Sequence, residues 1–341
     1  MPRKFDVPAL VEGVKAGSRS HVAQAITLVE SRLPAHRPLA RQLLTELTPT
    51  DTRAVRVGIS GVPGAGKSTF INAMGQLLIG QGHKVAVLAV DPSSSRTGGS
   101  VLGDRTRMGE LTQSPDAFVR PSPSGNHLGG VARATREAML VVEAAGFDVV
   151  IVETVGVGQS EVAVSGMVDT FLMLALARSG DQLQGIKRGI LEITDVIAVN
   201  KADGDNAGES RVTARELSIA MKLVTSQNDD RRVPVLTCSA LKDIGLQEVW
   251  DAVLEHRAWL DEHVGLARHR AEQQVVWMGS QLEATLLDSM RSTEELRSLR
   301  AQLEQEVRHG RTSAMEAAGD FLASYARAVP GMDWARGDLP S

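Results

Sequence analysis

The chain has 341 residues, which is enough for one large domain with helical additions. Its net charge of -4 gives no overall attraction for nucleic acid or anionic lipid. It has no apolar run long enough for a membrane span, no secretory signal at its start, and a lone cysteine, Cys238, that cannot form an intramolecular disulfide. We therefore expect a cytoplasmic protein that binds neither nucleic acid nor membrane.

The first part of the chain has helical spacing and no strand-like alternation between residues 8 and 48. Val22, Ile26, Val29 and Leu33 recur on one helical face. This pattern predicts two or three short helices in an N-terminal helical segment, residues 1–50.

Short β-branched runs begin at Val55 and alternate with longer helical stretches. Such alternation is typical of an α/β fold with a mainly parallel sheet covered by helices on both faces. The predicted strands are 55–60, 84–90, 147–153, 169–176, 195–200 and 233–239. We assign them to one domain, residues 51–262.

A phosphate-binding loop follows the first predicted strand. The stretch GVPGAGKST at residues 61–69 matches G-x-x-x-x-G-K-[ST] and runs into a predicted helix. Its backbone N–H groups and the positive end of the helix can bind phosphate, and Lys67 adds a full charge at the β- and γ-phosphates. The Ser68 hydroxyl is expected to bind Mg²⁺. The expected nucleotide-binding residues here are Gly61, Gly64, Ala65, Gly66, Lys67, Ser68 and Thr69.

The loop after the second predicted strand carries charged candidates for a switch. Asp91 and Asp104 could bind Mg²⁺, directly or through water, in one nucleotide state. Arg105 and Arg107 could neutralise charge in the transition state. Solvated loop carboxylates and ordinary surface arginines remain the alternative.

The third predicted strand ends in Glu153-Thr154-Val155-Gly156. Many G proteins have Asp-x-x-Gly at this place, with the carboxylate on a Mg²⁺-bound water and the glycine N–H facing the γ-phosphate. Glu153 could reach a metal-bound water or orient the attacking water. Alternatively, it could be a glutamate at the end of a strand whose hydrogen bonds are satisfied within the fold and which has no catalytic role. Gln159 is three residues past Gly156, so we do not assign it to catalysis.

The next predicted strand leads into a polar, glycine-containing stretch at residues 178–189. A loop at the carboxyl end of a strand is well placed to sense a nucleotide or a partner. We therefore expect a further switch loop there.

The residues that recognise the nucleotide base are predicted to be Asn200-Lys201-Ala202-Asp203, at the end of the strand 195–200. The Asp203 carboxylate can accept hydrogen bonds from N1–H and the 2-amino group of guanine, and adenine offers neither donor. Lys201 would lay its aliphatic stem along the base. GTP is therefore favoured over ATP.

A second base-binding loop is predicted where the last strand ends. Ser239, Ala240 and Leu241 resemble the loop whose backbone contacts the guanine oxygen in G proteins. Cys238 just before it fits a buried small hydrophobic residue better than a reactive thiol.

Strands stop after about Gly245, and a long helical region begins. Two apolar stripes are separated by a break near Ser292, the first at Val275, Met278, Leu282 and Leu286 and the second at Leu296, Leu299, Leu303 and Val307. They could pack on the chain's own core or form a helical dimerisation arm. We assign residues 263–341 to this C-terminal helical arm.

Together these motifs resemble one family, the G-protein chaperones of methylmalonyl-CoA mutase of the MeaB/ArgK/MMAA type. The residues that carry the resemblance are 61–69, 91–95, 103–105, the segment ETVGVGQSE at 153–161, 180–181 and 200–203. It implies a GTPase that uses GTP/GDP, binds an adenosylcobalamin-dependent mutase, gates loading of that cofactor and protects the enzyme. It also implies a homodimer built through the C-terminal helices, and a switch loop in which Lys187 couples partner binding to hydrolysis.

The expected roles can be summarised by residue. Those expected to act in hydrolysis are Lys67, Glu153, Asp104, Arg107 and Lys187. Those expected to hold Mg²⁺ are Ser68, Asp91, Asp104 and Glu153.

Three other functions stay open from the sequence. An ATP-driven kinase or transport accessory protein is disfavoured by Asp203. A metallochaperone GTPase would need a metal-binding cluster, and the lone cysteine and scattered histidines offer none. If Glu153 or the switch loop could not support hydrolysis, the protein would be a non-enzymatic binding module.

Overall fold

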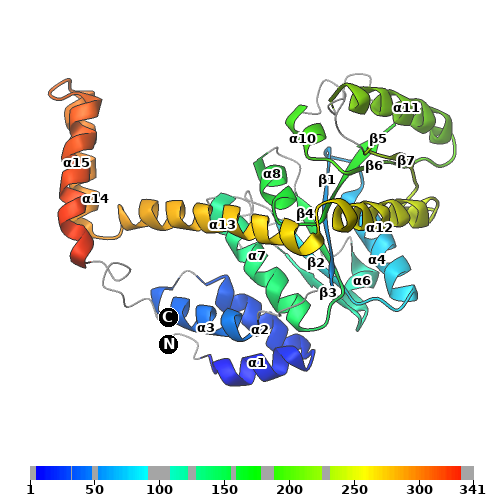
Figure 1. The fold of residues 1–341 in the computed structure, drawn as a ribbon, viewed down its shortest axis with the longest axis horizontal. Coiled ribbons are helices and arrows are strands. Elements are labelled where there is room, and N and C mark those ends of the chain that lie inside the picture. The colour runs from blue at the N-terminus through cyan, green and yellow to red at the C-terminus, as the bar shows by residue number, and fades with distance from the viewer. Residues whose placement is uncertain are drawn as a thin grey trace. The chain divides into compact units, whose positions relative to one another are not determined.

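The computed structural model describes residues 5–31, 33–47, 53–90, 108–121, 128–154, 159–177, 188–224 and 231–331 (Figure 1). The chain separates into two compact units, Met1–Ala271 and Glu272–Ser341. The three-part division with boundaries after residues 50 and 262 stays a prediction.

A seven-stranded parallel sheet forms the centre of the first unit, in the order β3-β2-β4-β1-β5-β6-β7. The strands are β1 (Val55–Gly61), β2 (Val85–Val90), β3 (Ala117–Arg120), β4 (Val149–Thr154), β5 (Thr170–Leu176), β6 (Val196–Asn200) and β7 (Val235–Thr237). The predicted parallel α/β fold is confirmed. Since all strands run the same way, the loops after β1, β4 and β6 leave from one edge of the sheet.

Alternate residues of each strand face opposite helical layers. On one face, Val57 and Ile59 of β1 pack with α4 (Lys67–Gly80) and α12 (Leu246–His263). The short helix α6 (Gly109–Gln113) contributes Leu111 to the same core. Both faces are apolar because both are covered, as expected for a parallel sheet.

The other face is covered by α7 (Leu128–Ala144) and α8 (Gln159–Ser165). Farther along the sheet, α10 (Arg188–Glu192) and α11 (Asn206–Val224) cover β5 and β6 through a separate apolar cluster that includes Met173, Ile197 and Leu217.

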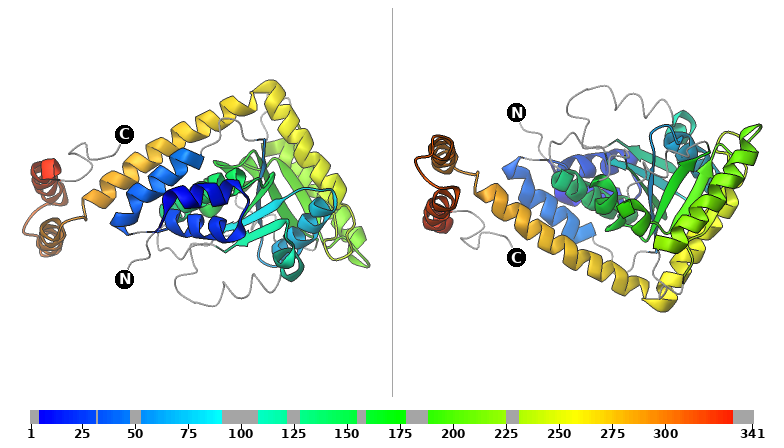
Figure 2. Two further views of the ribbon diagram at one scale, coloured as in Figure 1. Left: turned by 90° about the horizontal axis from the view of Figure 1, so that it is seen from below. Right: turned by 90° about the horizontal axis from the view of Figure 1, so that it is seen from above.

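The N-terminal helices share a core with this second face. They are α1 (Val7–Lys15), α2 (Arg19–Val29) and α3 (Arg37–Leu47), with a 3-10 turn, η1 (Pro34–His36), before α3. Figure 2 shows them, in blue, grouped beside the sheet. Val22, Ile26 and Val29 are buried as predicted. Leu33 was wrongly placed on their face, because α2 ends before it and its side chain is 50% exposed.

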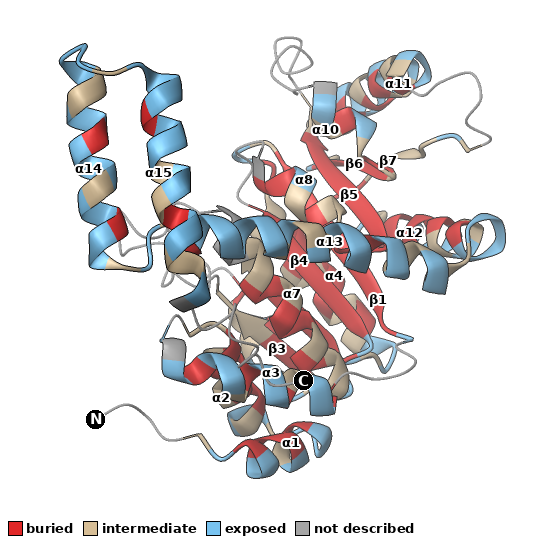
Figure 3. Ribbon diagram, turned by 60° about the vertical axis from the view of Figure 1, so that its left-hand side comes forward, coloured by how far each residue is buried: buried red, intermediate tan, exposed pale blue. Residues whose placement is uncertain are grey.

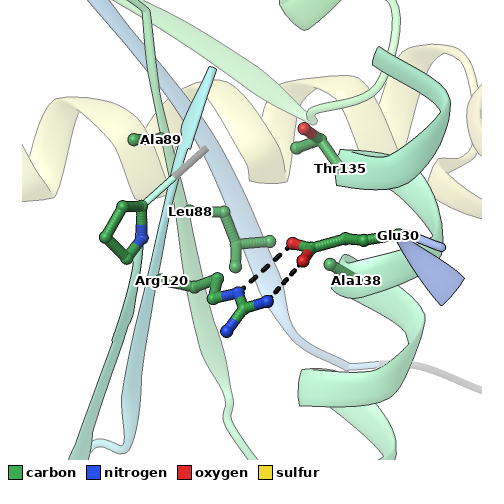
Figure 4. Close-up of a pocket in the computed structure, with 7 residues that line it drawn as sticks. Glu30, Leu88, Ala89, Arg120, Thr135 and Ala138 are labelled. Atoms are coloured by element: carbon green, nitrogen blue, oxygen red, sulfur yellow. Dashed lines mark hydrogen bonds and ion pairs between the residues drawn. The ribbon is translucent and has the colours of Figure 1, made fainter. Parts of the chain in front are cut away.

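An ion pair fastens α2 to the edge strand β3. Arg120 Nε donates to Glu30 Oε1 at 3.2 Å, and its Nη2 pairs with Oε2. Figure 4 shows this pair at a small pocket that Leu88, Thr135 and Ala138 also line. The two charges already satisfy each other, so the pocket has little capacity to bind a further charged group.

The C-terminal region consists of α13 (Leu266–Ser289), α14 (Glu294–Arg308), α15 (Ala314–Ala328) and a 3-10 turn, η2 (Val329–Gly331). The break predicted near Ser292 falls between α13 and α14, and the Thr293 side chain caps α14 by accepting from Leu296 N–H. Leu296 and Tyr325 are buried between α14 and α15, and Ser289 Oγ lies 2.5 Å from the Tyr325 hydroxyl.

The first apolar stripe of this region is exposed. On α13, Val275, Met278, Leu282 and Leu286 are 57%, 57%, 59% and 42% exposed. Figure 3 shows most of this helix in the colour of exposed residues. None of the helices in the described parts of the chain is long and apolar enough to cross a membrane.

Candidate nucleotide-binding site

The predicted phosphate loop joins the end of β1 to the start of α4. Gly64 and Gly66 both have φ of +84°, in the left-handed region that favours glycine. A Cβ added at Gly61 would lie 2.5 Å from the Leu174 carbonyl oxygen on β5, so that position needs glycine for space. The loop turns sharply because glycines stand where the backbone requires them.

Lys67 begins α4 and turns back over this loop. Its Nζ donates to the Gly61 carbonyl oxygen at 2.8 Å. Gly66 caps the helix without a side-chain acceptor, so it leaves first-turn amides for an anion. Ser68 is half-buried and Thr69 exposed in that first turn, whereas Ala65 is buried in the core.

The predicted base-reading residues lie in two loops that β6 and β7 bring together. Ser239 Oγ donates to Asp203 Oδ1 at 2.6 Å, and Ala202 N–H donates to the Cys238 carbonyl oxygen at 2.9 Å. Lys201 has a φ of +64°, which turns the chain sharply after Asn200. The hydrogen bond from Ser239 fixes the orientation of the Asp203 carboxylate.

Asn200 links the base loops to the phosphate loop. Its Nδ2 donates to the Ala65 carbonyl oxygen at 2.8 Å, and its Oδ1 accepts from Ala240 N–H at 3.0 Å. The side chain is buried, with 1% exposed. A Cβ at Gly66 would lie 3.0 Å from Asn200 Nδ2 and 3.6 Å from Lys201 Cε, so the two halves of the site are in direct contact.

The loop after β7 contains the other predicted base-binding residues. The Ala240 N–H donates to Asn200 Oδ1 at 3.0 Å, and the Leu241 side chain is 73% exposed. Cys238 is buried, and burial raises the pKa of its thiol to about 12. This thiol is therefore protonated at neutral pH and acts as a small packing group.

Glu153 lies beside the phosphate-loop strand. It is the penultimate residue of β4 and pairs with Ile59 of β1. Its side chain is mostly buried. The sheet order therefore brings a carboxylate from β4 to the edge from which the phosphate loop leaves.

Several predicted residues lie outside the described parts of the chain. These are Asp91, Asp104, Arg105, Arg107, Gly156 and Lys187. Within the described ranges, no group of three or more His, Cys, Asp or Glu side chains is arranged to hold a metal ion. Of the four predicted Mg²⁺ ligands, only Ser68 and Glu153 are described.

The sequence pattern did not reveal two contacts made here. Asn200 was expected only as part of the base motif, but it also bonds the phosphate loop at Ala65. The hydrogen bond from Ser239 to Asp203 joins residues far apart in sequence. Motif spacing carries no signal for either, since each depends on which strands are neighbours.

Known proteins share these features over most of the chain. A family model described as methylmalonyl Co-A mutase-associated GTPase MeaB matches residues 22–295. The probable GTPase Rv1496 of Mycobacterium tuberculosis is 53% identical over 316 residues, covering 93% of this chain and 94% of that protein. The mitochondrial methylmalonic aciduria type A homolog of Mus musculus is 41% identical over 329 residues, covering 94% and 79%.

A solved structure is similar in both sequence and fold. It is the crystal structure of an LAO/AO transport system kinase, with 37% identity and a TM-score of 0.74, covering 94% of this chain and 99% of that one. The phosphate loop, the adjacent base loops and these matches agree. The chain is a GTPase that binds guanine nucleotide, and it belongs to the family of methylmalonyl-CoA mutase-associated GTPases of the MeaB type.

Proposed function

We propose that this GTPase is a chaperone of an adenosylcobalamin-dependent methylmalonyl-CoA mutase, whose cofactor loading it gates and which it protects from inactivation. The observation that carries the proposal is the family match over residues 22–295, because it spans the nucleotide domain and all of α13. The name of the mouse relative, methylmalonic aciduria type A homolog, also refers to methylmalonate. A switch GTPase suits such a task, since its nucleotide state can alter a partner's contacts.

In the proposed site, guanine nucleotide lies across the contact between the two halves. The amides of residues 61–69 and the Lys67 ammonium hold the phosphates. Asp203 would read guanine with both carboxylate oxygens, since the Ser239 hydroxyl occupies only one of the two lone pairs of Oδ1. The Ala240 N–H already donates to Asn200 Oδ1, so it could donate to the guanine oxygen only in a bifurcated hydrogen bond. The Leu241 N–H is therefore a second candidate donor.

Mg²⁺ fits the donor set that the structure describes. Ser68 supplies a hydroxyl from the first turn of α4 and Glu153 a carboxylate from the neighbouring strand. Hard oxygen donors of this kind suit Mg²⁺, which would offset the charge of the phosphates. Asp91 and Asp104 are proposed to complete the set.

The remaining roles concern hydrolysis. We assign Glu153 to orienting the attacking water or a metal-bound water, and Gly156 to the γ-phosphate. Arg107 would neutralise transition-state charge, and Lys187 would couple a bound mutase to turnover.

We also propose a homodimer built through α13. Val275, Met278, Leu282 and Leu286 form an exposed apolar stripe on that helix, and a second copy would cover it. A Met278→Glu/Leu282→Glu variant should sediment as a monomer at concentrations where the wild type is a dimer. A monomeric wild type would contradict the dimer.

An ATP-dependent kinase or transport accessory protein is the second candidate, because the similar solved structure is described as a transport system kinase. Parallel titrations with GTP and ATP separate the two functions. A preference for ATP of about tenfold, or about 1.4 kcal/mol, would overturn the guanine assignment.

The chaperone proposal is tested with the purified mutase of the same organism. The two proteins should form a complex whose affinity differs between GDP and a non-hydrolysable GTP analogue. The mutase should also accelerate GTP hydrolysis, because many switch GTPases rely on a partner to complete charge stabilisation. Absence of a complex in every nucleotide state would refute the proposal.

A further inference from the structure

A buried carboxylate lies on the far side of the phosphate-loop strand from α4. Glu161, in the first turn of α8, is 0% exposed. Its Oε1 accepts from Ser60 Oγ at 3.3 Å and its Oε2 accepts from Ser160 Oγ at 3.1 Å. Burying a carboxylate is unfavourable unless polar partners compensate, so this placement needs an explanation.

Through Ser60, the carboxylate contacts the base of the phosphate loop. Ser60 precedes Gly61, and the Gly61 carbonyl oxygen accepts from Lys67 Nζ at 2.8 Å. Because a peptide bond joins Ser60 to Gly61, a displacement of the Ser60 backbone also moves Gly61 and its carbonyl. Glu161 is therefore connected to Lys67 by two hydrogen bonds and one peptide link.

The packing of α8 on β1 is tight at this point. A Cβ added at Gly58 would lie 2.8 Å from Val164 Cγ1, so the glycine makes room for α8. Two residues farther along β1, Ser60 makes the polar contact to the same helix. The apolar contact sets how close α8 lies, and the polar contact sets its register along β1.

The neighbouring strand supplies a further polar group on the same face. Ile59 pairs with Glu153, so Ser60 and Thr154 are the next residues along β1 and β4 and face the same side. Thr154 is fully buried, and its hydroxyl has no hydrogen-bond partner among the described residues. Thr154 thus adds a second buried hydroxyl to the face of the sheet that α8 covers.

We infer that Glu161 is a positioning residue for GTP hydrolysis, which holds α8 against β1 so that Lys67 and Glu153 keep their relative placement. The inference rests on the roles proposed above for these two residues. Glu161 is not assigned any contact with a reacting atom. Its contribution is to fix the strand that carries the Gly61 carbonyl and the strand that carries Glu153.

Single-turnover hydrolysis without mutase tests the inference. Glu161→Leu should slow hydrolysis by about 10-fold, and Ser60→Ala by about 3-fold, because each removes a hydrogen bond that holds the geometry. Glu161→Gln should recover most of the rate, since its amide oxygen can still accept from one serine. GDP affinity should stay close to that of the wild type in all three variants.

A double-mutant cycle and a matched control separate positioning from stability. In the Glu161→Leu background, Ser60→Ala should have no further effect on the rate, because the two groups act through one contact. Ser289→Ala removes a buried serine hydroxyl from its contact with Tyr325 in the C-terminal unit and should leave hydrolysis unchanged. If Glu161→Leu fails to fold, Ser60→Ala with Glu161→Gln still provides the test.

Three results would overturn the inference. They are a wild-type rate for Ser60→Ala, independent effects of the two substitutions in the cycle, and an equal loss of rate in Ser289→Ala. A protein that hydrolyses GTP but never binds a mutase would contradict the chaperone proposal alone, because these rates are measured without a partner.

Discussion

The phosphate half and the base half of the site are built in different ways. The phosphate half is one continuous stretch, residues 61–69, shaped by glycines at left-handed φ values and by the start of α4. The base half joins residues 200–203 to residues 238–241, which meet because β6 and β7 are neighbours in the sheet. The geometry of the phosphate half is therefore set locally along the chain, whereas that of the base half depends on which strands are neighbours in the sheet.

The two halves should therefore respond differently to substitution. In the phosphate half, most of the predicted donors are backbone amides, and Lys67 is the main side-chain group. In the base half, the Asp203 and Ser239 side chains bond each other, and Asn200 bonds both halves. Substitutions in the base half should change which nucleotide binds, while Lys67 should affect every nucleotide.

The largest effect is expected from Lys67→Ala. Removing a charged donor to phosphate should weaken GDP and GTP binding by about 100-fold and abolish measurable hydrolysis. Fluorescent-nucleotide titration and phosphate release check this. Lys84→Ala, at an exposed lysine before β2, is the matched control and should bind as the wild type does. Equal binding by Lys67→Ala and wild type would remove Lys67 from the site.

Asn200→Ala should give the next largest effect, because it breaks the contact between the halves. The buried Ala65 carbonyl and Ala240 N–H both lose their partner, which we expect to cost about 2 kcal/mol of unfolding free energy. GDP affinity should fall by about 10-fold. Urea unfolding and calorimetric titration measure the two quantities. A loss of stability with unchanged GDP affinity would show that Asn200 does not align the halves.

Ser239→Ala should have a smaller and more selective effect. The variant loses the 2.6 Å hydrogen bond that orients Asp203, so guanine affinity should fall by about 3- to 10-fold. Pyrophosphate, which lacks a base, should bind the variant and the wild type equally. A parallel loss of pyrophosphate affinity would place the effect in the phosphate half.

The smallest effect concerns Cys238, which is buried next to the base loop. Because burial raises the pKa of its thiol to about 12, iodoacetamide at pH 8 should leave the folded protein unmodified. Mass spectrometry should show one adduct after denaturation in guanidinium. Rapid modification of the folded protein would show that this loop opens readily.

Much of the fold was predictable because its signals are local. The six predicted strands correspond to β1, β2, β4, β5, β6 and β7, since buried parallel strands are runs of apolar residues. β3 was missed because it has only four residues, two of them partly exposed. α15 lies within the predicted helical arm, residues 263–341, but no apolar stripe was assigned to it.

Amphipathic periodicity predicted helices at both ends, but not what covers them. Val22 and Ile26 of α2 are buried within the first unit, whereas Met278 and Leu282 of α13 are exposed. The same spacing produces both stripes, so the covering partner is information that periodicity lacks. The site shows the same limit, since the phosphate loop follows from its motif but the bridge by Asn200 follows from strand order.

The most direct test of the guanine site is Asp203→Asn, assayed with guanine and xanthine nucleotides. Guanine presents two donors to the carboxylate, whereas xanthine has an oxygen in place of the 2-amino group and suits the donor and acceptor of asparagine. We expect GDP affinity to fall by about 100-fold and xanthosine diphosphate to bind the variant more tightly than GDP does. Unchanged GDP affinity in Asp203→Asn, with no gain for xanthosine diphosphate, would contradict the assignment of Asp203 as the reader of the base.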